Sequence, residues 1–230
     1  MKGKVVAFIP ARGGSKSIPY KNIASLNGKP LLSYGINACK ESRLIDTIIC
    51  STDSNKIKKV AQDWGIRVVN RPKELAEDTS NVVDAVLNWK ELEDYEYILL
   101  IQPTSPFIKR QHIEQVIKSL EENAEHINCQ TISKVAHNNH AWNQRIILDS
   151  GTVKFAYETE RLNAYNKQLK TNYYIFGNII ASRVKELLIN KNFFAAPCGY
   201  IEIGWPYNID IDSKQDLIIA EALLKSGLIN

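Results

Sequence analysis

Short apolar runs alternate with helical patterns over the first half of the chain, and this alternation is the feature that most limits the possible folds. The apolar runs, which are rich in β-branched and aromatic residues, cover positions 5–9, 46–51, 66–69 and 97–101. The helical patterns, with apolar residues three and four positions apart, cover positions 30–42, 54–64, 80–92 and 111–121. Strands and helices that alternate in this way predict a mainly parallel α/β sheet.

The pattern changes in the second half of the chain. Strands are expected at 128–136 and 173–181, a hairpin at 145–149 and 152–157, and short strands at 200–203 and 207–211. Residues 158–172 are polar and irregular, and Ser213 with Asp216 has the spacing of a capping box before a last helix. Because no repeat or linker divides the chain, residues 1–230 are predicted to form one domain, with residues 137–172 as an excursion from its sheet.

The amino-acid composition gives no indication of a nucleic acid or membrane partner and suggests the cellular location. The 230 residues are 44% hydrophobic and 23% charged, as expected for a globular core, and the net charge of +4 is too small to indicate a nucleic acid or membrane partner. No apolar run approaches the roughly 18 residues of a membrane helix. The four cysteines form no Cys-x-x-Cys pair, and no signal peptide is visible. We therefore expect a reducing, cytoplasmic location.

The first apolar run leads into a loop with an unusual composition, residues 10–22, which we call the cradle loop. Gly13 and Gly14 permit a positive φ angle and expose backbone amides, while Arg12, Lys16 and Lys21 supply positive charge. Such a loop directly after a strand predicts a phosphate-binding site. It matches neither the P-loop nor the Gly-x-Gly-x-x-Gly pattern, and a basic surface loop with a tight turn is the alternative.

Polar clusters follow four predicted strands. Besides the cradle loop they are Ser51-Thr52-Asp53, Asn70-Arg71 and Gln102-Pro-Thr-Ser105. Ligands of parallel α/β sheets bind at the carboxyl ends of the strands, so the coincidence predicts one ligand site. Helix capping alone can explain Ser51–Asp53, and likewise residues 78–80.

Two carboxylates stand close together near the end of the chain, in Asn208-Ile-Asp-Ile-Asp212. In a strand, Asp210 and Asp212 would share one side, where they would repel each other without a cation between them. With a phosphate-bearing substrate to supply further oxygen ligands, Mg²⁺ fits such a pair. The alternative is that one carboxylate caps the last helix and the other is solvated.

Five motifs in order along the chain resemble the signature of the acylneuraminate cytidylyltransferases, the CMP-sialic acid synthetases. They are Ala11-Arg-Gly-Gly-Ser-Lys-x-Ile-Pro-x-Lys-Asn22, Ser51-Thr-Asp53, Arg71-Pro-x-Glu-Leu-Ala-x-Asp-Thr79, Leu100-Ile-Gln-Pro-Thr-Ser-Pro106 and Asp210-Ile-Asp212. The related synthetases of CMP-Kdo differ in the first loop. The resemblance implies a Rossmann-like nucleotidyltransferase sheet of the GT-A-like kind, flanked by helices.

The resemblance also implies an activity: transfer of CMP from CTP to the anomeric hydroxyl of a nine-carbon sugar acid, with release of pyrophosphate. Arg12, Lys21, Asp210 and Asp212 would be catalytic, and the two aspartates would hold Mg²⁺. The implied nucleotide-binding residues are Ala11, Arg12, Gly13, Gly14, Ser15, Lys16, Lys21, Asn22, Arg71, Asp78, Thr79 and Ser80. The excursion at 137–172 would form a homodimer and reach toward the partner's site.

The departures from the family pattern lie on the sugar side. Gln102, Thr104 and Ser105 are the implied sugar-binding residues of the sheet. Many members carry an Arg near position 166, where this chain offers Lys167 or Lys170 to meet the sugar carboxylate, without the fork of a guanidinium. The acceptor therefore stays open among sialic, legionaminic, pseudaminic and other nonulosonic acids. The alternatives are a nucleotidyltransferase for an octulosonate or a sugar phosphate, and a nucleotide-binding homologue without synthetase activity.

Overall fold

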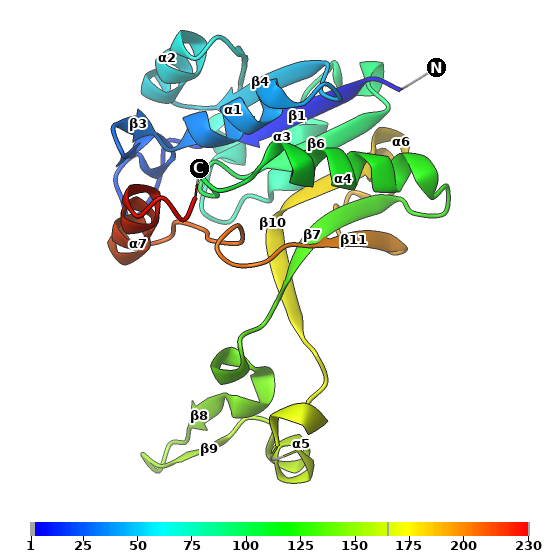
Figure 1. Ribbon diagram of the computed structural model, residues 1–230. Coiled ribbons are helices and arrows are strands. Elements are labelled where there is room, and N and C mark those ends of the chain that lie inside the picture. Colours follow the sequence, from blue (N-terminus) through cyan, green and yellow to red (C-terminus); the bar gives the residue numbers. More distant parts are fainter. Residues whose placement is uncertain (1–2, 165, 230) are drawn as a thin grey trace.

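A seven-stranded sheet forms the centre of the protein, with the strand order β11-β7-β10-β6-β1-β4-β5 (Figure 1). The computed structural model describes residues 3–164 and 166–229. The strands of the sheet are β1 (Val5–Pro10), β4 (Thr47–Thr52), β5 (Arg67–Asn70), β6 (Tyr97–Ile101), β7 (Asn128–Lys134), β10 (Tyr174–Arg183) and β11 (Cys198–Glu202). All the pairings are parallel except those of β10, which runs antiparallel to both β6 and β7. The predicted mainly parallel α/β sheet is confirmed.

The central strands are apolar on both faces because helices cover both. Alternate residues of β1 enter two different cores, with Val5, Ala7 and Ile9 on one side and Val6 and Phe8 on the other. The first core contains residues of α1 (Leu32–Glu41), α2 (Asn55–Asp63) and α4 (Arg110–Glu122), and the second contains residues of α3 (Val82–Leu87) and α6 (Val184–Asn190). This two-sided burial explains the continuous apolar runs of the sequence.

Two predicted elements differ in the structure. The helix expected at 80–92 is limited to α3. Turns follow it, in which Trp89 N–H donates to Val86 O and Leu92 N–H donates to Trp89 O. The strand expected at 207–211 is not formed: turns occupy the chain after Gly204, and Ile211 N–H donates to Thr104 O in a loop. Apolar periodicity marked residues that are buried or partly buried in both places, such as Val86 and Ile211, but it predicted the wrong backbone conformation.

Residues 137–172 project from the sheet as an arm, at the end of the long strands β7 and β10 (Figure 1). The predicted hairpin is present as β8 (Arg145–Ile147) and β9 (Val153–Phe155). The segment expected to be irregular instead contains α5 (Glu158–Asn163) and a 3₁₀ helix at Lys167–Leu169. None of the helices in residues 3–164 and 166–229 has the length and apolar character that crossing a membrane requires.

The last helix, α7 (Lys214–Lys225), begins with the predicted capping box. Ser213 Oγ accepts from Asp216 N–H at 3.3 Å, and Asp216 Oδ2 accepts from Ser213 N–H at 2.7 Å. We expect Ser213→Ala to lower the free energy of unfolding by about 1 kcal/mol, because the first turn loses an acceptor. Urea denaturation measures this, with Ser213→Thr as the control that keeps the hydroxyl. Equal stability of the alanine variant and the parent would contradict the role of the cap.

Candidate active site

The polar segments that follow β1, β5 and β6 line one cavity of about 490 Å³. Of the residues predicted for the site, the cavity brings together Arg12, Gly14, Ser15, Lys16, Lys21, Asn22, Arg71, Asp78, Ser80, Gln102 and Thr104. They meet because β1, β5 and β6 run in the same direction and end at the same edge of the sheet. Three of the four predicted polar clusters thus line one cavity, while Ser51–Asp53 does not; that this cavity binds a ligand stays a prediction.

The cradle loop is fastened at its start and at its end. Ala11 is buried, and its N–H donates to Ser51 O at 2.9 Å. Asn22, also buried, donates from Nδ2 to Arg12 O at 2.9 Å. Asp53 accepts the N–H of Gly13 at 2.8 Å. The polar cluster after β4 therefore positions the loop, a role that sequence reasoning did not assign to Asp53.

Gly13 of the cradle loop serves a different purpose from the one expected. Neither Gly13 nor Gly14 has a positive φ, whereas Tyr20, just before Lys21, has a φ of 50°. A Cβ at Gly13 would lie 2.9 Å from the Cβ of Ser54. Gly13 is thus required by the close approach of the loop to the start of α2, and its N–H is already bound to Asp53.

Each of the three cations of the cradle loop has a carboxylate partner. Arg12 Nη1 lies 2.9 Å from Asp78 Oδ1, and Lys16 Nζ lies 2.6 Å from Asp78 Oδ2. Lys21 Nζ lies 2.7 Å from Asp212 Oδ1 and is largely covered, with 17% of its side chain exposed. The hydrogen bond and charge of Lys16, together with Arg12, hold the pKa of Asp78 below its usual value.

Arg71 is buried at the wall of the same cavity. Its Nε donates to Leu75 O at 2.6 Å. Burial lowers the pKa of its guanidinium, Asp53 acts in the opposite direction and Arg12 adds to the lowering. Arginine remains protonated under such shifts, so a fixed positive charge stands beside the cavity. Ser80 donates from Oγ to Glu74 O at 2.8 Å, and Thr79 is exposed beside it.

The two carboxylates near the end of the chain lie beside the loop that follows β6. Ser105, which is buried, donates from Oγ to Asp210 Oδ1 at 3.1 Å. The backbone bond of Ile211 to Thr104 holds the two segments together at 2.8 Å. The prediction that Asp210 and Asp212 share one side of a strand is wrong, because this strand is not formed. Asp212 nevertheless contacts the cradle loop through Lys21.

The residues present suit a magnesium ion whose ligands would be protein carboxylates together with phosphate oxygens of the substrate. Asp212 contacts Lys21, which lines the cavity, and Asp210 contacts Ser105, which follows the cavity-lining Thr104. The two aspartates do not line the cavity themselves but place carboxylate oxygens next to residues that do. No group of three or more His, Cys, Asp or Glu suited to a metal occurs in the part of the chain that the structure describes. Mg²⁺ in phosphate-binding enzymes needs only one or two protein carboxylates, so this donor set fits it.

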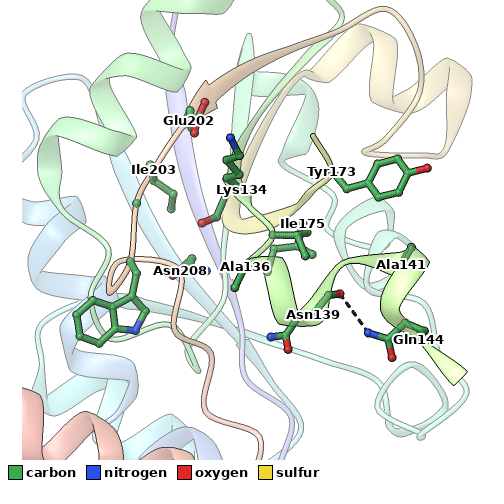
Figure 2. Close-up of a pocket in the computed structure, with 14 residues that line it drawn as sticks. Lys134, Ala136, Asn139, Ala141, Gln144, Tyr173, Ile175, Glu202, Ile203 and Asn208 are labelled. Atoms are coloured by element: carbon green, nitrogen blue, oxygen red, sulfur yellow. Dashed lines mark hydrogen bonds between the residues drawn. The ribbon is translucent and has the colours of Figure 1, made fainter. Parts of the chain in front are cut away.

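A second cavity, of about 800 Å³, lies at the base of the arm (Figure 2). Lys134, Ala136 and Asn139 line it on the arm side, and Ile203 and Asn208 line it from the segment after β11. Asn208 Oδ1 is buried and has no hydrogen-bond partner among the described residues. Sequence reasoning missed this cavity, although Asn208 and Trp205, which both line it, stand shortly before Asp210 in the sequence.

The two lysines predicted to meet a sugar belong to the arm, and Lys170 does not line the first cavity. Lys170 Nζ donates to Asn143 Oδ1 at 2.7 Å, within the arm. Lys167 lies in the 3₁₀ helix Lys167–Leu169, and its side chain is outside the described residues. Their assignment to a sugar site stays a prediction that depends on a second subunit.

The sequence matches a family of known proteins over most of its length. Residues 6–194 match the model of the cytidylyltransferase family. An N-acylneuraminate cytidylyltransferase of Escherichia coli is 31% identical over 96% of this chain, and this chain spans 52% of that protein, about half its length. A CMP-N,N'-diacetyllegionaminic acid synthase of Legionella pneumophila is 30% identical over 96% of this chain and 97% of its own.

A solved structure shows the same fold. A CMP-2-keto-3-deoxy-manno-octonic acid synthetase, solved in complex with CTP, superposes with a TM-score of 0.75 at 14% identity, over 97% of this chain and 99% of its own. The family match, the relatives and this architecture agree with the motifs of the sequence. The chain therefore belongs to the cytidylyltransferase family.

Proposed function

We propose that the protein transfers CMP from CTP to the anomeric hydroxyl of a sialic acid or a related nine-carbon nonulosonic acid, with release of pyrophosphate. The observation that carries the proposal is the first cavity, where the cationic cradle loop meets the polar end of β6 beside the carboxylates Asp210 and Asp212. The names of the relatives support the same activity. This arrangement suits a phosphoryl transfer, which needs positioning and charge neutralisation more than covalent work by the protein.

In this proposal the triphosphate of CTP lies along the cradle loop. Arg12, Lys16 and Lys21 neutralise phosphate oxygens, and Arg71 with residues 78–80 holds the cytidine. Gly14 and Ser15 contribute backbone or polar groups, while Ala11, Gly13 and Asn22 hold the loop in place through their bonds to Ser51, Asp53 and Arg12. Asp210 and Asp212 would hold Mg²⁺, which when bound neutralises phosphate charge. The acceptor hydroxyl attacks the α-phosphate in line with the leaving pyrophosphate.

The acceptor is proposed to lie beside Gln102, Thr104 and Ser105 and to extend toward the second cavity. Asn208 supports this direction, because its buried Oδ1 lacks a hydrogen-bond partner among the described residues and stands two positions from Asp210. Lys167 and Lys170 would come from the arm of the partner subunit.

A homodimer is proposed from the surface of the arm. The apolar side chains exposed there are Ile146, Ile147, Val153, Tyr157, Leu162 and Leu169. Exposed apolar side chains gathered on one segment favour contact with another protein surface. We also place the protein in the cytoplasm, supported by the free, buried thiols of Cys39, Cys50 and Cys129.

Lys21→Ala is expected to lower kcat/KM for CTP by roughly 100-fold, the cost of removing one preorganised charge from a phosphoryl-transfer site. Steady-state kinetics with varied CTP measures the change. Lys56→Ala is the control, because Lys56 lies over the ring of Tyr20, with Nζ 4.4 Å from its centroid, rather than in the cavity. An unchanged kcat/KM of the Lys21 variant would remove this residue from the phosphate site.

The proposed function is tested by pyrophosphate release with CTP, Mg²⁺ and a panel of acceptors: N-acetylneuraminate, legionaminate, pseudaminate, Kdn and Kdo. Release with a nonulosonate alone is the expected result and names the sugar. Release with Kdo alone would place the enzyme with the octulosonate synthetases. CTP binding without pyrophosphate release for any acceptor of the panel would indicate another acceptor, such as a sugar phosphate, or a homologue without synthetase activity.

A further inference from the structure

A carboxylate already stands where the phosphate-binding side chains of the cradle loop converge. Asp78 contacts Arg12 through one oxygen and Lys16 through the other, at 2.9 and 2.6 Å. Two cations that each meet one oxygen of a single anionic group are the arrangement expected around a phosphate. Asp78 therefore satisfies in the free protein the same charges that would meet an anionic ligand.

The backbone around Asp78 presents this carboxylate in a defined position. Arg12 also donates from Nη1 to Ala76 O at 3.4 Å, and Arg71 donates to Leu75 O at 2.6 Å. Ser80 closes the segment with its bond to Glu74 O. Residues 74–80 are thus attached to two cavity-lining arginines, which brings the carboxylate of Asp78 to the cavity wall.

We propose that Asp78 is an internal competitor of the nucleotide: its carboxylate occupies an anion position of the cradle loop and is displaced by the triphosphate of CTP. The proposal rests on the proposed function and goes beyond it, because it makes Asp78 a determinant of how tightly polyphosphates bind. A residue that only held the cytidine would have no reason to pair with both Arg12 and Lys16.

The exposure of the three side chains makes the exchange reversible. Side-chain exposure is 33% for Arg12, 47% for Asp78 and 86% for Lys16. Ion pairs so exposed to water are weak, so a triphosphate with several charges can replace a single carboxylate. The same carboxylate would return to the cations when pyrophosphate leaves. Asp78 thus weakens the binding of the substrate and of the product together.

The test measures binding of inorganic tripolyphosphate by calorimetry, without turnover. We expect Asp78→Asn to bind it about fivefold more tightly than the parent, since two weak ion pairs no longer compete. Glu77→Gln is the matched control, because Glu77 is the exposed neighbour of Asp78 and has no ion pair in the described residues. Its affinity should stay within about twofold of the parent.

A second pair of variants tests whether the effect of Asp78 on tripolyphosphate affinity depends on its contact with Lys16. In a Lys16→Met background, Asp78→Asn should give a smaller gain in tripolyphosphate affinity than in the parent, because one of the competing pairs is already absent. Circular dichroism checks that all the variants are folded. An equal gain with and without Lys16 would overturn the proposal.

The proposal is also overturned if Asp78→Asn leaves the affinity unchanged or weakens it, or if Glu77→Gln gives the same gain, which would indicate general electrostatics. These outcomes leave the proposed function standing as long as the parent binds CTP and releases pyrophosphate with a nonulosonate. Failure of the parent to bind both CTP and tripolyphosphate would instead remove the phosphate site itself, and with it both proposals.

Discussion

Asp212→Asn is expected to reduce turnover by roughly 100-fold or more while the protein keeps its fold. The reaction loses a charged oxygen ligand for the proposed Mg²⁺ and the ionic partner of Lys21, and losses at or behind metal ligands reach this size. The fold should not depend on the carboxylate, because 76% of the Asp212 side chain is exposed. The measurement is kcat for pyrophosphate release at saturating CTP and Mg²⁺, alongside thermal unfolding.

Glu221→Gln is the matched control for this prediction. It removes the same charge from α7, where Glu221 pairs with Lys225 one helical turn away. Its turnover should stay within about twofold of the parent, since such surface pairs contribute little. Near-normal turnover of Asp212→Asn at saturating Mg²⁺ would reject the metal-binding role of Asp212. A joint loss of turnover and of the thermal transition would show instead that the carboxylate supports the fold.

Phe8→Ala is expected to have the largest effect on stability. Phe8 is fully buried in β1, opposite Leu100 of β6 and Ile49 of β4 in the second core, and its ring centroid lies 6.4 Å from that of Trp89. Loss of a buried phenylalanine side chain costs about 3–5 kcal/mol, because the cavity it leaves does not fully collapse. In a chain of this size, the melting temperature should fall by roughly 6–20 °C. Differential scanning calorimetry measures the shift.

The control for Phe8 is an aromatic residue on the edge of the same sheet. Tyr200 lies in β11 and is 64% exposed, so Tyr200→Ala should change stability by only about 0.5 kcal/mol. A shift of the Phe8 variant as small as that of the Tyr200 variant would contradict the assignment of β1 to the centre of the core. The cradle loop follows β1 directly, so the Phe8 variant also tests how far the site depends on this strand.

The sequence by itself determined the central sheet and the meeting of polar residues at one cavity. Continuous apolar runs separated by helical patterns can be buried only in a sheet that helices cover on both faces, and the strands β1, β4, β5 and β6 followed from them. Polar residues at the ends of such strands had to meet, because parallel strands end at the same edge of the sheet. Arg12, Arg71 and Gln102 line one cavity because the strands before them run in the same direction.

Tertiary structure alone decided which group each site residue meets. Gly13 bonds to Asp53, which is 40 positions away, and Lys21 bonds to Asp212 across 191 positions. The periodicity of the sequence does not indicate which distant residues meet. It therefore could not predict the close approach of Gly13 to Ser54, the ion pairs of Asp78 or the cavity beside Asn208. The same limit explains the absent strand at 207–211: Ile211 is buried as its pattern required, but its N–H bonds to a loop because the fold places no strand beside it.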